Sequence, residues 1–293
     1  MMGADWFVEE QAPGLCFGVR VSSKLLSLRT SFQQLDLLET TSFGRLLALD
    51  GRVMLTERDE MFYHEMLVHP AMLAHPEPLR VAVIGGGDGG AVREVLRHPS
   101  VLHVDWVELD EMVIAVAREH LPSVCQGVFD DSRVTLLTMP GEEWASQCSR
   151  DFDLIIVDGT DPIGPAVPLF DRSFFACCQR GLRVGGLFAT QTGSPFYYPD
   201  ELRSVHGRLR EAFGSVEVRL GFVPTYPAVW SYCLAGAGPL NLAASEVERR
   251  FAARKLNLSY LTPSLHLASA VLPGFVASLL TAAADSTRGE DDG

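Results

Sequence analysis

From residue 80 onward, short apolar runs alternate with stretches that have the spacing of amphipathic helices. The pairs are VAVIG with GAVREVLRH, VDWVELD with EMVIAVAREHL, RVTLLT with EEWASQ, FDLIIVD with SFFACCQRGL, and GLFATQ with ELRSVHGRLREAF. Fully apolar runs are typical of parallel strands buried on both faces, and the intervening stretches supply the covering helices. SVEVRLGF and VWSYCLAG indicate two closing strands. We predict a doubly wound, Rossmann-like α/β fold of the methyltransferase type, with a mostly parallel sheet.

The segment before this alternation has a different pattern. Residues 6–56 alternate apolar and polar positions and carry turn signals at Phe43-Gly44 and Asp50-Gly51, which predicts a small N-terminal antiparallel β domain. A helix is expected over 59–73, followed by a proline-containing linker. The predicted units are a β-rich domain with its connecting helix, a Rossmann-like nucleotide-binding domain, and a C-terminal helical segment with a disordered tail, covering residues 1–73, 78–236 and 237–293.

Charge excludes one class of partner. The chain has 37 acidic and 24 basic residues, a net charge of -13, which argues against nucleic acid because phosphate binding needs a basic patch. A cationic substrate is compatible with this balance. Part of the charge lies in the tail GEDDG, and a solvated acidic surface explains a low pI equally well.

Cysteine spacing and hydropathy indicate a cytoplasmic, globular protein. The six cysteines lack C-x-x-C spacing, so neither a metal site nor a disulfide framework is predicted. The acidic N-terminal stretch is unlike a signal peptide. Residues 265–284 approach membrane-spanning length, but Pro273 and Gly274 interrupt them. We therefore expect two short packed helices there and no membrane association.

A glycine loop follows the first of the parallel strands. In VAVIGGGDGG, Gly85, Gly87 and Gly90 fit the G-x-G-x-x-G spacing at which backbone approaches a nucleotide. Asp88 would repel the pyrophosphate of a dinucleotide at close range. An adenosyl sulfonium with an amine tail fits better, because the carboxylate would hold its positive charge. The alternative is that Asp88 only caps the following helix.

Three further acidic residues follow strands at the same predicted edge of the sheet. Glu108 comes eighteen positions after Gly90, about the spacing at which an acidic residue binds both ribose hydroxyls. Alternatively, it only favours a helix dipole. Asp158 ends an apolar strand and Asp161 follows it in DGTDPIGPA, where D-x-x-D-P also makes a good turn. Because a buried carboxylate is expensive unless a cation or donor meets it, these residues predict a pocket for cations.

These motifs together resemble one family. FYHEM at 62–66, GGGDGG, VELD, VDGTDPIGPA and PTYP at 224–227, in this order, closely resemble the spermidine synthase (polyamine aminopropyltransferase) family, and the resemblance runs from about residue 6 to 275. It implies transfer of a 3-aminopropyl group from decarboxylated S-adenosylmethionine, a co-substrate rather than a bound cofactor, to a diamine such as putrescine. The products would be spermidine and methylthioadenosine. It also implies a homodimer formed through the N-terminal segment.

The resemblance assigns roles to particular residues. Asp88 would hold the aminopropyl ammonium of the donor, Glu108 its ribose, and Asp158 would be the general base or orienting carboxylate for the attacking amine. Residues 158–170 would form a lid. Further contacts to the acceptor would come from Tyr63, His64, Asp161, Gln191, Tyr226 and Trp6. From the sequence alone, the aromatic residues and glutamine of this set are explained equally well by packing, and His64 by an exposed helix position.

Three departures from the family pattern leave alternatives open. Pro140 stands where the family usually has the Asp that holds the adenine amino group, which leaves adenine to Glu142 or to backbone groups. Val167 replaces a common lid glutamate, and the Y-P-x-G-x-W pattern is shortened at 226–230. The alternatives are an S-adenosylmethionine-dependent methyltransferase and a catalytically silent polyamine- or nucleoside-binding homologue.

Overall fold

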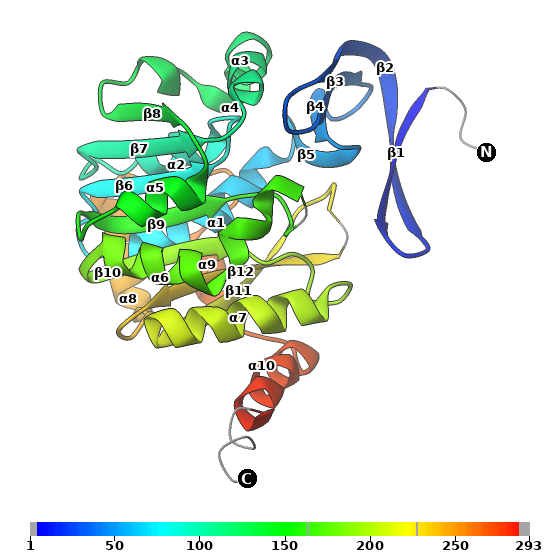
Figure 1. Cartoon of the computed structure of the whole chain (residues 1–293). Helices are drawn as coiled ribbons and strands as arrows, with labels where there is room; N and C mark the ends of the chain where they lie inside the picture. Colours follow the sequence, from blue (N-terminus) through cyan, green and yellow to red (C-terminus); the bar gives the residue numbers. More distant parts are fainter. Residues whose placement is uncertain (1–4, 163, 227, 287–293) are drawn as a thin grey trace.

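The computed structural model describes residues 5–162, 164–226 and 228–286, and these form two β-sheets with helices around the larger one (Figure 1). The predicted disorder of the tail concerns residues 287–293, which lie outside the described residues.

The smaller sheet is N-terminal and antiparallel, as predicted, with strand order β1-β2-β3-β4-β5. Its strands are β1 (Trp6–Ala12), β2 (Leu15–Arg29), β3 (Gln34–Thr40), β4 (Arg45–Leu49) and β5 (Arg52–Thr56). Asp50 and Gly51 join β4 to β5 with φ of 48° and 77°. Two positive φ values are what a two-residue type I′ hairpin turn requires, so the Asp-Gly signal predicted this turn correctly.

The larger sheet has the order β11-β12-β10-β9-β6-β7-β8. Its strands are β6 (Arg80–Gly85), β7 (His103–Glu108), β8 (Val134–Thr138), β9 (Phe152–Asp158), β10 (Leu182–Gln191), β11 (Ser215–Phe222) and β12 (Val229–Gly236). The strands from β10 to β8 in this order are parallel, whereas β12 is antiparallel to both of its neighbours. The predicted doubly wound, mostly parallel sheet is confirmed.

Both faces of this sheet are covered by helices (Figure 1). Val81 and Val83 of β6 pack into a core with α1 and α2, whereas Ala82 and Ile84 pack into a second core with α5, α6 and α7. Successive side chains of a strand point to opposite faces, which is why the apolar runs are continuous. The helices named here are α1 (Glu60–Ala74), α2 (Gly90–Leu96), α5 (Gly141–Gln147), α6 (Arg172–Gly181) and α7 (Pro199–Phe213).

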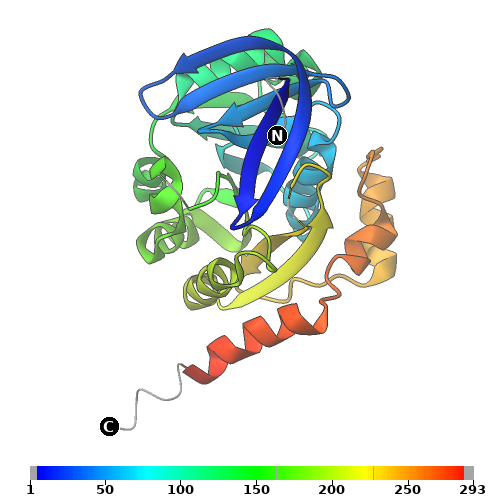
Figure 2. The same ribbon diagram turned by 90° about the vertical axis from the view of Figure 1, so that its right-hand side faces the viewer.

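Other helices lie along the edges and at the C-terminal end. They are α3 (Glu111–His120), α4 (Pro122–Cys125), α8 (Ala244–Ala253), α9 (Pro263–Ala268) and α10 (Gly274–Ser286), with 3₁₀ turns η1 (Val128–Asp130) and η2 (Gly164–Phe170). The apolar stretch near the C-terminus is broken between α9 and α10, as Pro273 and Gly274 predicted. Figure 2 shows α10 projecting from the body of the chain. Among the described helices none has the length and apolar character that a membrane crossing requires.

Candidate active site

A cavity of about 220 Å³ lies between the N-terminal sheet and the carboxyl ends of the central parallel strands. Ligands of open α/β sheets bind at this edge. Ten of the residues singled out from the sequence line it: Tyr63, His64, Gly85, Gly87, Asp88, Glu108, Asp158, Asp161, Gln191 and Tyr226. Three other residues predicted for the site do not line the cavity in the part of the chain that the structure describes: Trp6, Gly90 and Pro140.

The glycine loop brings backbone close to the end of β9. The Gly86 N–H donates to the carbonyl oxygen of Asp158 over 2.9 Å. Gly86 has φ of 64°, and a Cβ there would lie 2.6 Å from Asp158 Oδ2. A side chain is excluded by both the backbone conformation and the space. Only glycine at position 86 therefore lets the loop pack against the carboxylate of Asp158.

Asp88 both lines the cavity and bonds to the start of α2, whereas its predicted contact with a cationic ligand stays a prediction. Its Oδ1 accepts a hydrogen bond from the Gly90 N–H at 2.7 Å, which caps the start of α2. The same oxygen lies 3.3 Å from His64 Nε2. A Cβ at Gly90 would lie 2.3 Å from His64 Cε1, so Gly90 makes room for the imidazole ring.

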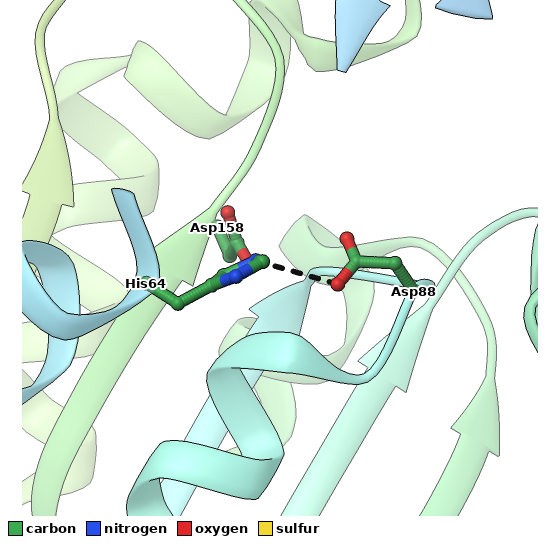
Figure 3. Close-up of side chains that lie close together, drawn as sticks. All are labelled: His64, Asp88 and Asp158. Carbon is green, nitrogen blue, oxygen red and sulfur yellow. Dashed lines mark ion pairs between the residues drawn. The ribbon is translucent and has the colours of Figure 1, made fainter. Parts of the chain in front are cut away.

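His64 stands between two carboxylates of the site (Figure 3). It projects from α1, is 2% exposed, and directs Nε2 towards Asp88 from the glycine loop and Asp158 at the end of β9. The distance from Nε2 to Asp158 Oδ2 is 3.9 Å. Burial opposes a charged imidazole, but Asp88 and Glu60 raise the pKa of His64 well above its usual value. The two carboxylates thus favour the protonated form of the ring between them.

A buried network of charged residues contacts His64 on the side of Nδ1, away from Asp88 and Asp158. Its Nδ1 lies 2.6 Å from Glu60 Oε2, one helical turn earlier on α1. Arg93 of α2 donates to both oxygens of Glu60 at 2.9 and 2.8 Å and from Nε to Glu94 at 2.7 Å. Against the effect of burial, His64 and Arg93 lower the pKa of Glu60. Sequence reasoning missed this network, although the i, i+4 spacing of Glu60 and His64 was a usable signal.

Asp158 is a buried carboxylate, and the described residues donate a hydrogen bond to only one of its two oxygens. Its Oδ1 accepts a hydrogen bond from the Tyr63 hydroxyl at 2.8 Å. Its Oδ2 is buried and has no hydrogen-bond partner within the described part of the chain. Burial raises the pKa of Asp158 to about 6, and Asp88 adds to this effect while His64 and Tyr63 oppose it. Asp158 lines the cavity, and its carboxylate retains an oxygen that no protein donor meets among the described residues.

Glu108 ends β7 on the other side of the glycine loop. Its Oε1 accepts from the Asp110 N–H at 2.9 Å, and a Cβ at Gly87 would lie 3.0 Å from its Oε2. Burial raises the pKa of Glu108 to about 7. Hydrogen bonds from the hydroxyl groups of a ligand would stabilise the ionised form of such a buried carboxylate.

Asp161 has a partner that the sequence did not predict. Its Oδ2 lies 3.2 Å from Nη1 of Arg52, at the start of β5. Burial raises the pKa of Asp161, and Arg52 opposes that effect. Glu9 of β1 also lines this end of the cavity, and its Oε2 accepts from the Val53 N–H at 2.9 Å. Arg52 and Glu9 come from the N-terminal sheet, so only the docking of the two sheets places them here.

The remaining predicted residues occupy different positions. Gln191 Nε2 donates to the Gly159 carbonyl at 3.2 Å, and its Oε1 accepts from the Gly193 N–H at 2.8 Å, so its amide orders backbone at the ends of β9 and β10. Tyr226 lines the cavity and its hydroxyl donates to the Met54 carbonyl at 2.5 Å. Trp6 is 41% exposed on β1.

Pro140 precedes α5 as its N-cap residue. The residues after it, Gly141 and Glu142, line the cavity. Both alternatives for holding adenine, Glu142 and backbone groups, are therefore present in the cavity wall next to Pro140.

One His and two carboxylates are also a possible metal set. The ligand atoms of His64, Asp88 and Asp158 lie within 4.8 Å of one another. In this structure His64 Nε2 is directed at an oxygen of Asp88, at 3.3 Å. The absence of a metal stays a prediction.

Comparisons with known proteins match one family over nearly the whole chain. Residues 60–241 match the spermine/spermidine synthase domain, and residues 5–57 match the spermidine synthase tetramerisation domain. The polyamine aminopropyltransferase of Caldicellulosiruptor saccharolyticus is 39% identical over 94% of this chain and 98% of its own. That of Moorella thermoacetica is 42% identical over 96% and 98%, respectively.

Two solved structures share the fold. A spermidine synthase in complex with the transition state analogue AdoDATO superimposes with a TM-score of 0.90 at 35% identity, covering 96% of both chains. Spermidine synthase from Thermotoga maritima gives a TM-score of 0.88 at 35% identity, covering 94% of both. The matches extend over both sheets and the cavity between them, and the chain therefore belongs to the spermidine synthase family.

Proposed function

We propose that this protein transfers an aminopropyl group from decarboxylated S-adenosylmethionine to a diamine, with putrescine as the default acceptor. The observation that carries the proposal is the placing of Asp88 and Asp158 on either side of the buried His64 ring, in one cavity at the strand ends. The family relationship favours this reaction over methyl transfer and over silent binding.

We assign the donor to the glycine-loop side of the cavity. Gly85 and Gly87 allow close approach, whereas Gly90 makes room for His64. Asp88 binds the aminopropyl ammonium, and Glu108 accepts hydrogen bonds from the ribose hydroxyls. The raised pKa of Glu108 supports this role, because two hydroxyl donors would stabilise its ionised form. Asp88 would repel the α-carboxylate of S-adenosylmethionine that has not been decarboxylated, which gives donor specificity.

Adenine is the part of the donor for which this chain departs from its family. Pro140 offers no carboxylate or amide donor. We assign adenine recognition to Glu142 and the backbone beside it, which line the cavity.

We assign the acceptor to the other side. Asp158 takes the proton of the attacking amine, with Tyr63 holding the carboxylate in place through its hydrogen bond. Asp161 binds the amine, Tyr226 and Gln191 form the channel wall, and residues 158–170 act as a lid. Trp6 and Glu9 lie on the N-terminal sheet, towards which the far end of the diamine would extend.

The reaction needs a neutral amine, because an ammonium has no lone pair. Free aliphatic amines have pKa values of about 10, so one proton must be removed. The nitrogen lone pair attacks the methylene carbon bound to sulfur, the carbon–sulfur bond breaks, and its electrons neutralise the sulfonium as methylthioadenosine leaves. Asp158 accepts the displaced proton, and its pKa of about 6 makes it a stronger base than an ordinary aspartate. Alignment of nitrogen, carbon and sulfur supplies further acceleration.

The proposal predicts a measurable product. Purified protein incubated with decarboxylated S-adenosylmethionine and putrescine should release methylthioadenosine and form spermidine in equal amounts. Cadaverine, agmatine and spermidine test the acceptor range, and ordinary S-adenosylmethionine is the matched control donor. Folded protein that releases no methylthioadenosine with any of these amines would contradict the proposal.

Arg52 is expected to limit affinity for the acceptor. Its guanidinium pairs with Asp161 at 3.2 Å and would repel an incoming ammonium. Arg52→Gln should lower the KM for putrescine about two- to fivefold, the range expected for a partly exposed ion pair, and leave the KM of the donor unchanged. Steady-state kinetics with each substrate varied separately measure both. A higher putrescine KM would mean that Arg52 positions Asp161 for the acceptor.

Three broader predictions accompany this function. We propose a homodimer formed through the N-terminal sheet, supported by the match of residues 5–57 to a tetramerisation domain, which indicates self-association. We propose the cytoplasm as the site of action, supported by six free cysteines. We also propose the three structural units predicted from the sequence, with neither nucleic acid nor membrane as a partner.

A further inference from the structure

His64 is buried at the wall of the cavity, and the reaction proposed above does not use it. We propose that His64 is a built-in countercation for Asp88 and Asp158, and that it gives up its proton when the cationic donor binds. Donor binding would then release a proton to the solvent. This inference rests on the proposed function through the donor site at Asp88.

The first argument is the number of acceptors around the ring. A neutral imidazole has one N–H donor and one lone pair. Both ring nitrogens of His64 face carboxylate oxygens: Nδ1 faces Glu60 at 2.6 Å, and Nε2 faces Asp88 at 3.3 Å and Asp158 at 3.9 Å. Carboxylates only accept hydrogen bonds when ionised. With these carboxylates ionised, a proton on each ring nitrogen, which is the imidazolium, matches the geometry.

The second argument is the balance of charge from every element against the ring. Helix α1 contributes Glu60 and the neutral Tyr63, α2 contributes Arg93, the glycine loop contributes Asp88, and β9 contributes Asp158. Arg93 binds both oxygens of Glu60 and compensates that carboxylate.

Within the described residues, His64 is the cation directed at both Asp88 and Asp158, and it compensates their negative charge. A donor that brings its own positive charges to these carboxylates competes directly with the imidazolium.

The third argument is what His64 becomes after losing the proton from Nε2. Glu60 keeps the proton on Nδ1, because that nitrogen lies 2.6 Å from its carboxylate. The lone pair of Nε2 then faces the cavity as an acceptor. An ammonium has only N–H donors, and the neutral ring adds Nε2 to the Asp88 carboxylate, 3.3 Å away, as a second acceptor for it. The protonated ring repels the donor, whereas the neutral ring binds it.

The direction of the pH dependence follows from this exchange. Burial lowers the pKa of His64, but Asp88 and Glu60 together raise it well above its usual value in the free protein. The ammonium and sulfonium of the donor oppose a positive ring and so lower that pKa in the complex. Between the two pKa values, free His64 is protonated and the ring in the complex is neutral. Binding therefore releases one proton, and raising the pH tightens donor binding by up to about tenfold per pH unit.

Calorimetry measures the proton directly. We would titrate decarboxylated S-adenosylmethionine into chelator-treated protein at pH 8, in phosphate and in Tris, whose ionisation enthalpies differ. At this pH Asp158 and Glu108, with pKa values of about 6 and 7, are already ionised and contribute little. The expected result is release of about one proton per donor bound. Methylthioadenosine has neither the ammonium nor the sulfonium, and should bind with almost no proton release.

Variants identify the residue. His64→Gln keeps a hydrogen-bonding side chain but cannot hold a proton, so its binding of the donor should release almost none and should lose the pH dependence. His120→Gln removes a histidine from the end of α3, outside the cavity, and should behave as the wild type.

Two results would overturn the proposal. One is donor binding to the wild-type protein without proton release, and the other is full release from His64→Gln. Either would leave the proposed function standing, because donor binding itself would have been observed. A wild-type protein that does not bind the donor would instead contradict the proposed function, and this inference with it.

Discussion

Asp158→Asn should lower kcat by about 10²- to 10⁴-fold, the range typical of losing a positioned general base. The amide keeps an oxygen that can accept from the Tyr63 hydroxyl, as Oδ1 does at 2.8 Å, so the geometry of the site is retained. It cannot take the proton of the attacking amine. The wild-type fall in kcat/KM below about pH 6, where Asp158 binds a proton, should also be missing from the variant.

The controls separate chemistry from folding. The melting temperature of Asp158→Asn should not fall, because ionising a buried carboxylate with a raised pKa costs stability that the amide does not. Asp171→Asn removes an exposed carboxylate that makes no side-chain cap bond on α6, and should keep full activity. A loss of less than tenfold in Asp158→Asn would mean that another group takes the proton.

Asp88→Asn should weaken binding of decarboxylated S-adenosylmethionine by about 10- to 100-fold, because a hydrogen bond to a charged group contributes about 1.5–3 kcal/mol. The variant retains an oxygen that can accept from the Gly90 N–H, so the cap of α2 need not be lost. Calorimetric titration of the donor measures the change in Kd.

The matched ligand for this variant is methylthioadenosine, which has no ammonium for Asp88 to bind. Its affinity should change by no more than a few fold, and Asp171→Asn should bind both ligands as the wild type does. Equal losses for the two ligands would show that Asp88 supports the whole loop rather than the donor charge. Equal, small effects of Asp88→Asn and Asp158→Asn on turnover would contradict both roles.

Much of the fold could be predicted because its signals are local. The apolar runs became β6, β7, β8, β9 and β10 in one parallel sheet, since strands buried on both faces need apolar residues at every position. The Asp50-Gly51 turn was equally legible, because its two positive φ values favour this pair.

The carboxylates of the site were found for a related reason. Asp88, Glu108 and Asp158 follow the ends of strands, and parallel strands bring those ends to one edge. Their meeting in one cavity therefore follows from the alternation along the chain.

The partners of those carboxylates were not predicted. Arg93 binds Glu60 across 33 positions of sequence, and Arg52 pairs with Asp161 across 109. No period or turn signal relates residues so far apart. Their contacts depend on how α1 meets α2 and how the N-terminal sheet meets the strand ends.

The sequence by itself determined the order of strands and helices, the turns, and which acidic side chains stand at the edge of the sheet, because hydrophobic period and turn chemistry act over a few residues. Only the tertiary structure decided what surrounds His64. Packing places Glu60, Asp88 and Asp158 around one buried imidazole, and the strength of such interactions depends on distance and burial, which no local pattern in the sequence sets.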